Sequence, residues 1–219
     1  MATIAQTRAG TTWDAERWSP LAGVVAVLLW IIGIVIAGDI ENKDTGREIL
    51  AQYNSDGNQI LAAGLIWLIG TAFFIWFLGS LRSRLAAAEG PNQHFSAIAF
   101  AGGIVASVFL MLIPTANMVG VDQKEDLDAS AALAINKIGD IFWIGLLYTA
   151  PVLLAATAVV ALRTGAVLPR WLAWITLLMA IVMLVPVVGW AVISFAFPIW
   201  ILLVVWLMWR PETTRTIRP

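Results

Sequence analysis

Six runs of about twenty apolar residues constrain this chain more than any other feature of its sequence. They cover residues 21–38, 60–79, 97–119, 141–162, 171–188 and 190–209. A helix needs about 20 such residues to cross about 30 Å of hydrocarbon, because each residue adds about 1.5 Å. The pattern predicts an all-α fold, a polytopic transmembrane helix bundle of six spans that forms one domain over residues 1–219. The last two runs adjoin, and we expect a tight turn at Pro186 and Gly189 to separate them.

The composition is that of a membrane protein. Of the 219 residues, 60% are hydrophobic and only 12% are charged, a balance that would not keep a soluble domain of this size in solution. The first twenty residues, which include Trp13 and Arg17, are longer and more polar than a secretory signal. We therefore expect the first span to be an uncleaved anchor.

The distribution of charge predicts the orientation of the bundle. Nine of the 13 basic residues, among them Arg8, Arg17, Arg215 and Arg218, lie in the N-terminal segment, the 80–96 and 163–170 loops and the C-terminal segment. Ten of the 14 acidic residues lie in the remaining loops. By the positive-inside rule, both termini are expected to be cytoplasmic. Because the charge reports topology, no nucleic-acid partner is expected.

Tryptophans and two amphipathic segments add detail to this topology. Interfacial belts are predicted from Trp171, Trp174, Trp206 and Trp209 on the inner side and from Trp143 and Trp190 on the outer side. Outer segments at about 45–54 and 126–140 have helical apolar periodicity, and Thr45 with Glu48 matches a capping box. We interpret these segments as cover for the bundle, with ligand recognition as the alternative.

Catalytic and metal chemistry have little support in the sequence. The chain has no cysteine and one histidine, His94, in a polar stretch, so no metal site and no cofactor is expected. No charged residue lies in the middle of a span, where buried charge usually marks ion or proton transport. The remaining candidate for catalysis is Lys137 with Asp140, which we interpret instead as an interfacial pair.

Polar residues in three spans fall in the expected outer half of the membrane. Pro114, Pro151 and Pro198 accompany them and free backbone carbonyls in these helices. The predicted ligand-binding residues are Asn117, Tyr148, Thr149 and Ser194, below an outer rim of Asn58, Gln59, Lys137 and Asp140. The alternative is that these groups only bond neighbouring backbones and aid packing, as such residues commonly do in helical bundles.

Two connectors carry a resemblance to a known group. The segments "FLGSLRSRLAAAEG" (residues 77–90) and "ALRTGAVLPRWLAWITLLMA" (residues 161–180) resemble those of uncharacterised six-span integral membrane proteins of actinobacteria, a bacterial membrane family of unknown function. The resemblance implies a multi-pass protein of the bacterial plasma membrane. It implies no functional residues.

These observations favour a membrane protein without catalytic machinery. We expect it to bind an apolar or lipid-like ligand in its outer half, or to act as an accessory subunit of a membrane complex. The expected partners are membrane lipids and either a larger membrane protein complex or a second copy of the chain. The alternative is a permease for a neutral or apolar small solute, although the missing midplane charge and the missing repeat disfavour a usual secondary carrier.

Overall fold

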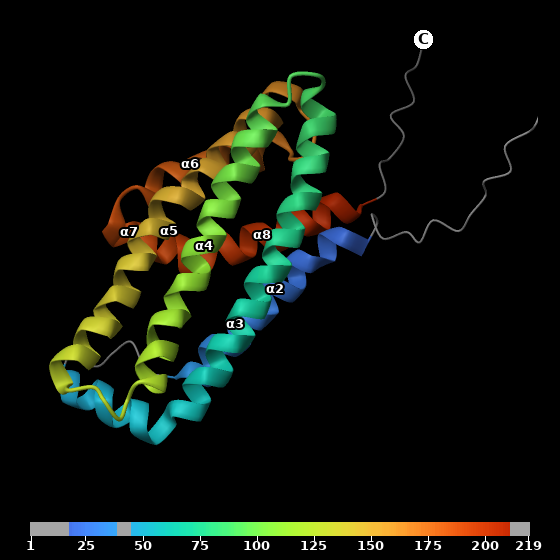
Figure 1. The fold of residues 1–219 in the computed structure, drawn as a ribbon. Coiled ribbons are helices and arrows are strands. Elements are labelled where there is room, and N and C mark those ends of the chain that lie inside the picture. The colour runs from blue at the N-terminus through green and yellow to red at the C-terminus, as the bar shows by residue number, and fades with distance from the viewer. Residues whose placement is uncertain (1–17, 39–44, 211–219) are drawn as a thin grey trace, which may run out of the picture.

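The computed structural model describes residues 18–38 and 45–210, and this part of the chain is entirely helical apart from short connections (Figure 1). The predictions for Arg8, Trp13, Arg17, Arg215 and Arg218 lie outside the described residues. The elements are η1 Ser19–Leu21, α2 Ala22–Ala37, α3 Gly46–Glu89, α4 His94–Asp122, α5 Ala129–Thr164, α6 Arg170–Met183, α7 Pro186–Ala191, the π-helical η3 Val192–Ala196 and α8 Phe197–Trp209.

The lengths of these helices make the chain a multi-pass membrane protein. Within the described residues, five helical stretches are long and apolar enough to cross a membrane; the last of them is Pro186–Trp209, which joins α7, η3 and α8. The stretch expected to be the fifth span is shorter, because α6 has only 14 residues. At about 1.5 Å per residue it extends about 21 Å, less than the hydrocarbon thickness of about 30 Å.

The last hairpin turns earlier than the sequence predicts. Helix α6 ends at Met183, the chain turns at residues 184–185, and Pro186 starts α7. Proline suits the first position of a helix, where its missing N–H costs no hydrogen bond. Gly189 lies inside α7 and not in the turn, and a Cβ there would come within 2.6 Å of the Met183 carbonyl oxygen. Because Gly189 has no side chain, α7 can pack closely against the end of α6.

Helices α3, α4 and α5 lie side by side and form the long axis of the bundle (Figure 1). Helix α2 packs along α3, α6 packs along α5, and α8 crosses behind these helices to meet α2. One hydrophobic core joins all of these helices. Its packing is close where α4 meets α5, since a Cβ on Gly102 would lie 2.9 Å from the Leu153 backbone nitrogen.

Indole N–H groups bond the helices to one another inside this core. Trp30 Nε1 of α2 donates to Thr71 Oγ1 of α3 at 3.1 Å. Trp67 Nε1 of α3 donates to the Leu110 carbonyl of α4 at 2.8 Å, and Trp200 Nε1 of α8 donates to Thr176 Oγ1 of α6 at 2.9 Å. A buried polar group without a partner is costly, so each bond fixes the register of two helices.

The bundle has two chemically different ends. One, which we name the arginine end, carries Arg82, Arg84, Arg163, Arg170 and Arg210. At the other, the first turns of α3 lie across the ends of α4 and α5 (Figure 1). We name this part the cap, defined as residues 45–60 and 116–140. It has a small hydrophobic core of its own, made by the buried residues Ile49, Tyr53, Ile60, Val121 and Ala132.

The cap begins with the capping box expected from the sequence. The Thr45 hydroxyl accepts from the Glu48 backbone N–H, and the Glu48 carboxylate accepts from the Thr45 N–H. The segment predicted as a separate helix at about 45–54 is continuous with the following span, since α3 runs unbroken for 44 residues. Helix α5 likewise starts in the cap, where the Asp128 side chain accepts from the Ala131 N–H at 2.8 Å, and continues into its apolar part.

Candidate functional site

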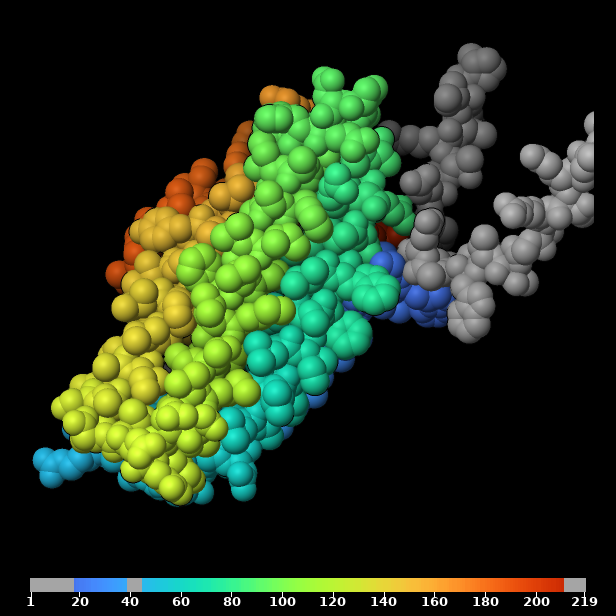
Figure 2. Space-filling view, in the orientation of Figure 1, coloured from blue at the N-terminus to red at the C-terminus, as the bar shows by residue number. Residues whose placement is uncertain are grey.

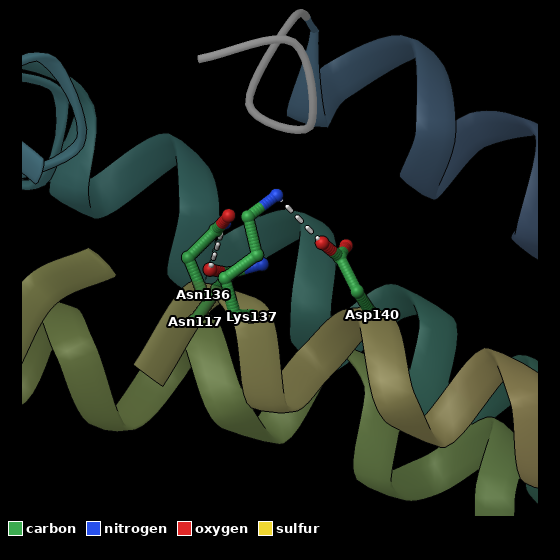
Figure 3. A network of polar contacts seen from close by, with 4 residues as sticks. All are labelled: Asn117, Asn136, Lys137 and Asp140. Carbon is green, nitrogen blue, oxygen red and sulfur yellow. Dashed lines mark hydrogen bonds and ion pairs between the residues drawn. The ribbon is translucent and has the colours of Figure 1, made fainter. Parts of the chain in front are cut away.

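Three cap helices meet at a buried polar cluster made of Tyr53, Asn117 and Asn136. The Tyr53 ring is fully buried, and its hydroxyl donates to Asn117 Oδ1 at 2.9 Å. Asn136 Nδ2 donates to the same oxygen at 3.2 Å (Figure 3). Residues of α3, α4 and α5 therefore share one acceptor. Asn117 is the one predicted ligand-binding residue that lies in this cluster. The cluster fixes the three helical segments of the cap to one another.

Sequence reasoning did not assign a site role to Tyr53 or Asn136. Tyr53 lies on the apolar side of the 45–54 segment, and its hydroxyl needs a partner because the ring is buried. Asn136 lies in an amphipathic helix, one residue before Lys137, and is only 4% exposed. A buried amide on an apolar helix face was the signal that could have found it.

The predicted rim residues lie at the surface of the cap. Lys137 Nζ and Asp140 Oδ2 are 3.0 Å apart, and their side chains are 57% and 45% exposed. Figure 3 shows this pair beside the asparagines, with Lys137 reaching along α5 to Asp140. Such an exposed pair contributes about 0–1 kcal/mol. Asn58 is exposed, and Gln59 donates through its amide to the Ile36 carbonyl, which ties the end of α2 to α3.

The other predicted ligand-binding residues are not brought to Asn117. Tyr148 is 49% exposed on the outer face of α5, and Ser194 is exposed in η3. The Thr149 hydroxyl donates to the Gly145 carbonyl of its own helix at 2.9 Å. Within the described part of the chain no hydrogen bond joins any of these three to Asn117, and none of them lines either of the cavities described below.

The π-helical turn at Ser194 has a local cause. Pro198 has no N–H, so the carbonyl one turn before it loses its α-helical donor. The preceding residues widen into π turns, in which the Phe197 N–H donates to the Val192 carbonyl. A π turn of this kind lets the helix continue past the proline although one carbonyl has lost its α-helical donor. The break expected at Pro198 is accommodated by the backbone of its own helix.

Two cavities lie at the arginine end. The larger has a volume of about 320 Å³ and opens between the end of α3, the turn after α5 and the end of α8. The smaller measures about 200 Å³. The larger is lined by Arg84, Ala87, Ala88, Ala166, Val167, Leu207, Met208 and Arg210, and the smaller by Glu89, Asn92, Phe95, Val160, Arg163 and Thr164.

The arginines at these cavities are held in place by neighbouring groups. Arg84 Nη2 donates to the Met208 carbonyl of α8 at 3.1 Å. The Arg210 guanidinium lies 3.3 Å from the Trp206 ring centroid, and the Arg163 guanidinium lies 4.5 Å from the Phe95 ring centroid. Stacking on an aromatic ring leaves the N–H groups at the edge of the guanidinium, where an anion can be bound.

Glu89, at the end of α3, caps the first turn of α4. Its two carboxylate oxygens each accept a backbone N–H, from Phe95 and from Ser96, both at 2.8 Å. Helix α3 is about twice the length needed to cross the hydrocarbon, and Glu89 lies about ten residues beyond its apolar run. Desolvation raises the pKa of this carboxyl, but the backbone hydrogen bonds outweigh it, so the pKa lies below the usual value.

His94 is exposed at the first position of α4.

The described residues contain two kinds of polar arrangement, the cap cluster and the arginines at the other end. Within residues 18–38 and 45–210 no group of three or more His, Asp or Glu side chains is placed to hold a metal ion. The cap cluster consists of neutral hydrogen-bonding groups that already satisfy one another. The arginine end offers positive charge beside an apolar cavity, which is suited to an anionic, amphipathic ligand.

Comparison with known proteins adds no further assignment. No family model matches the chain, and no curated protein or solved structure matches it. The resemblance to actinobacterial six-span membrane proteins remains a prediction.

Proposed function

We propose that the protein is a non-catalytic integral membrane protein that acts as an accessory subunit of a membrane complex, with the cap as its docking surface. The observation that carries this proposal is the cap itself. Three helices continue beyond their apolar parts, pack a second core and lock it with the Tyr53–Asn117–Asn136 cluster. A surface that is already ordered loses little entropy when it binds, so it is well suited to recognition.

The charge of the cap indicates the kind of partner. Its described residues include seven carboxylates and three cationic side chains. The carboxylates are Glu48, Asp56, Asp122, Glu125, Asp126, Asp128 and Asp140; the cations are Arg47, Lys124 and Lys137. Asp122, Glu125 and Asp126 are exposed around the α4–α5 turn, at the tip of the cap. A partner with a basic surface outside the membrane complements this charge.

The permease alternative has less support. A solute path needs polar groups that line a cavity near the middle of the membrane. The hydroxyls of Thr71 and Thr176, in the middle of α3 and α6, instead accept indole N–H groups inside the packed core.

Native mass spectrometry of the full chain, extracted from its own membrane in mild detergent, tests the accessory role. We expect a heteromeric complex of fixed stoichiometry that is lost in the triple variant Asp122→Asn, Glu125→Gln, Asp126→Asn. The control changes three charges at the opposite end, Arg82→Gln, Arg163→Gln and Arg170→Gln, and should leave the complex intact. A chain that emerges alone, or only as a dimer of itself, would contradict the proposal.

A further inference from the structure

The hairpin made of α6, α7, η3 and α8 turns part-way along the bundle. Both of its ends lie at the arginine end, where Arg170 begins α6 and the Met208 carbonyl of α8 accepts from Arg84 Nη2 at 3.1 Å. Figure 1 shows the turn at α7 beside the middle of α5, well short of the cap. The hairpin therefore returns to the end of the molecule from which it starts.

Helix α5 gives the level of this turn. Asp140 and Arg163 bound a stretch of α5 without charged side chains. At about 1.5 Å per residue this stretch is about 34 Å long, close to the hydrocarbon thickness of about 30 Å. A Cβ on Gly189 of α7 would lie 3.1 Å from the Leu147 side chain. Because Leu147 comes seven residues after Asp140, the turn packs about 10 Å inside the apolar stretch.

Helix α3 gives the level of the returning helix. The Phe197 ring, at the start of α8, packs against the Phe74 ring with centroids 5.9 Å apart. Phe74 comes fourteen residues after Ile60, the last α3 residue of the cap, which corresponds to about 21 Å. It precedes Arg82 by eight residues, or about 12 Å. Both helices thus place the hairpin in the part of the bundle nearer the arginine end.

The turn has the composition of a segment that lies in hydrocarbon. Apart from the Trp190 indole N–H, residues 183–191 have no polar side-chain group. Four large side chains at the turn are 48%, 54%, 89% and 49% exposed: Leu184, Val185, Val187 and Val188. The connections at 90–93, 123–128 and 165–169 contain or adjoin charged residues, as expected where a chain meets water.

The backbone of the turn is closed by its own hydrogen bonds. The N–H groups of four residues donate to carbonyls three or four residues earlier: Leu184, Val185, Val188 and Gly189. Pro186 has no N–H. Unpaired backbone groups are costly in hydrocarbon, and a turn can lie there only when its polar groups have partners and its backbone packs against protein. The contact of Gly189 with Leu147 and with the Met183 carbonyl provides that packing.

We propose that α6, α7, η3 and α8 form a re-entrant hairpin, which enters and leaves the membrane at the arginine end and whose turn contacts lipid acyl chains. Side chains such as Val187 are more stable in hydrocarbon than in water, and acyl chains are the apolar partner present at this level. The hairpin does not reach the cap, so it takes no part in the docking proposed there. The inference does not depend on that docking role.

Site-directed spin labelling tests this proposal cleanly, because the chain has no cysteine of its own. Val187→Cys is labelled in the full-length protein in vesicles of phosphatidylglycerol and phosphatidylcholine. Collision rates are measured with oxygen, which concentrates in hydrocarbon, and with a nickel chelate, which stays in water. The matched controls are Ile138→Cys, Ile144→Cys and Val152→Cys, whose positions on α5 are 46%, 47% and 42% exposed and span the level of the turn.

We expect the label at Val187 to have the oxygen-to-nickel ratio of Ile144 or a higher one, several times that of Ile138. Leu184→Cys, at the same turn, should give the same result and replaces Val187→Cys if that variant does not fold. A ratio closer to that of Ile138 would overturn the assignment, because the turn would then reach water, as it would if the bilayer thinned around the hairpin. Frequent collisions with both reagents would also overturn it, since they indicate a water-filled cavity.

Discussion

The cap cluster makes a quantitative prediction, because one acceptor serves two buried donors. Tyr53→Phe removes the hydroxyl that donates to Asn117 Oδ1 at 2.9 Å, but this oxygen keeps the Asn136 donor at 3.2 Å. The expected cost is therefore that of one ordinary hydrogen bond, about 0.5–1.5 kcal/mol. Asn117→Ala leaves two buried donors unpaired, each costing about 1–3 kcal/mol, so the loss should reach about 2 kcal/mol or more.

The free energy of unfolding can be measured by detergent titration of the purified protein in mixed micelles. The chain offers a matched control, since it has only two tyrosines and Tyr148 is half exposed without a hydrogen bond in the described part of the chain. Tyr148→Phe should change the unfolding free energy by less than about 0.5 kcal/mol. The reasoning fails if Tyr53→Phe costs as much as Asn117→Ala, or if Tyr53→Phe and Tyr148→Phe have the same effect.

Three further predictions concern the bundle and its arginine end. Thr176→Val keeps the shape of the side chain but leaves the Trp200 indole N–H without its acceptor, so the unfolding free energy should fall by about 1–3 kcal/mol. Gly102→Ala should overpack the contact between α4 and α5, which lowers the free energy of unfolding by about 1–3 kcal/mol and with it the thermal midpoint. Gly79→Ala places its methyl group in open space and should be neutral or stabilising. The lowered pKa of Glu89 contributes stability above the usual carboxyl pKa, and this is lost as the pH falls through the folded-state pKa; Glu89→Gln should lose that dependence in thermal scans between pH 7 and pH 4.

Local sequence signals predicted the fold well where they depend on neighbouring residues. The apolar runs predicted the helical bundle, and Thr45 with Glu48 predicted the start of α3, since a capping box uses groups only three residues apart. The turn near Pro186 was less predictable. Proline occurs both at helix starts and in turns, so Pro186 alone does not fix the boundary. Gly189 is needed for the close packing of α7 against Met183, which is a tertiary contact and not a local signal.

The candidate site was harder to predict, because side-chain direction depends on how the helices pack. Depth along each span placed Asn117, Tyr148 and Ser194 in the same layer, but depth does not give the rotation of a helix about its axis. Tyr148 and Ser194 point away from the bundle, while Asn117 points into it. The arginine cavity was missed for a related reason: each of its arginines was expected as a topology signal, and only the packing of α3 against α8 brings Arg84 and Arg210 together.

The two ends of the molecule differ in how their polar groups are used. In the cap, Tyr53, Asn117 and Asn136 satisfy one another inside, while Asp122, Glu125 and Asp126 are exposed outside. Figure 2 shows the cap segments packed against one another at one end of the molecule. At the arginine end, the guanidinium groups of Arg84 and Arg210 border an open cavity. In the cap, groups that satisfy one another stabilise a shape. The exposed carboxylates of the cap therefore stand on a fixed frame, which supports the docking role proposed for it.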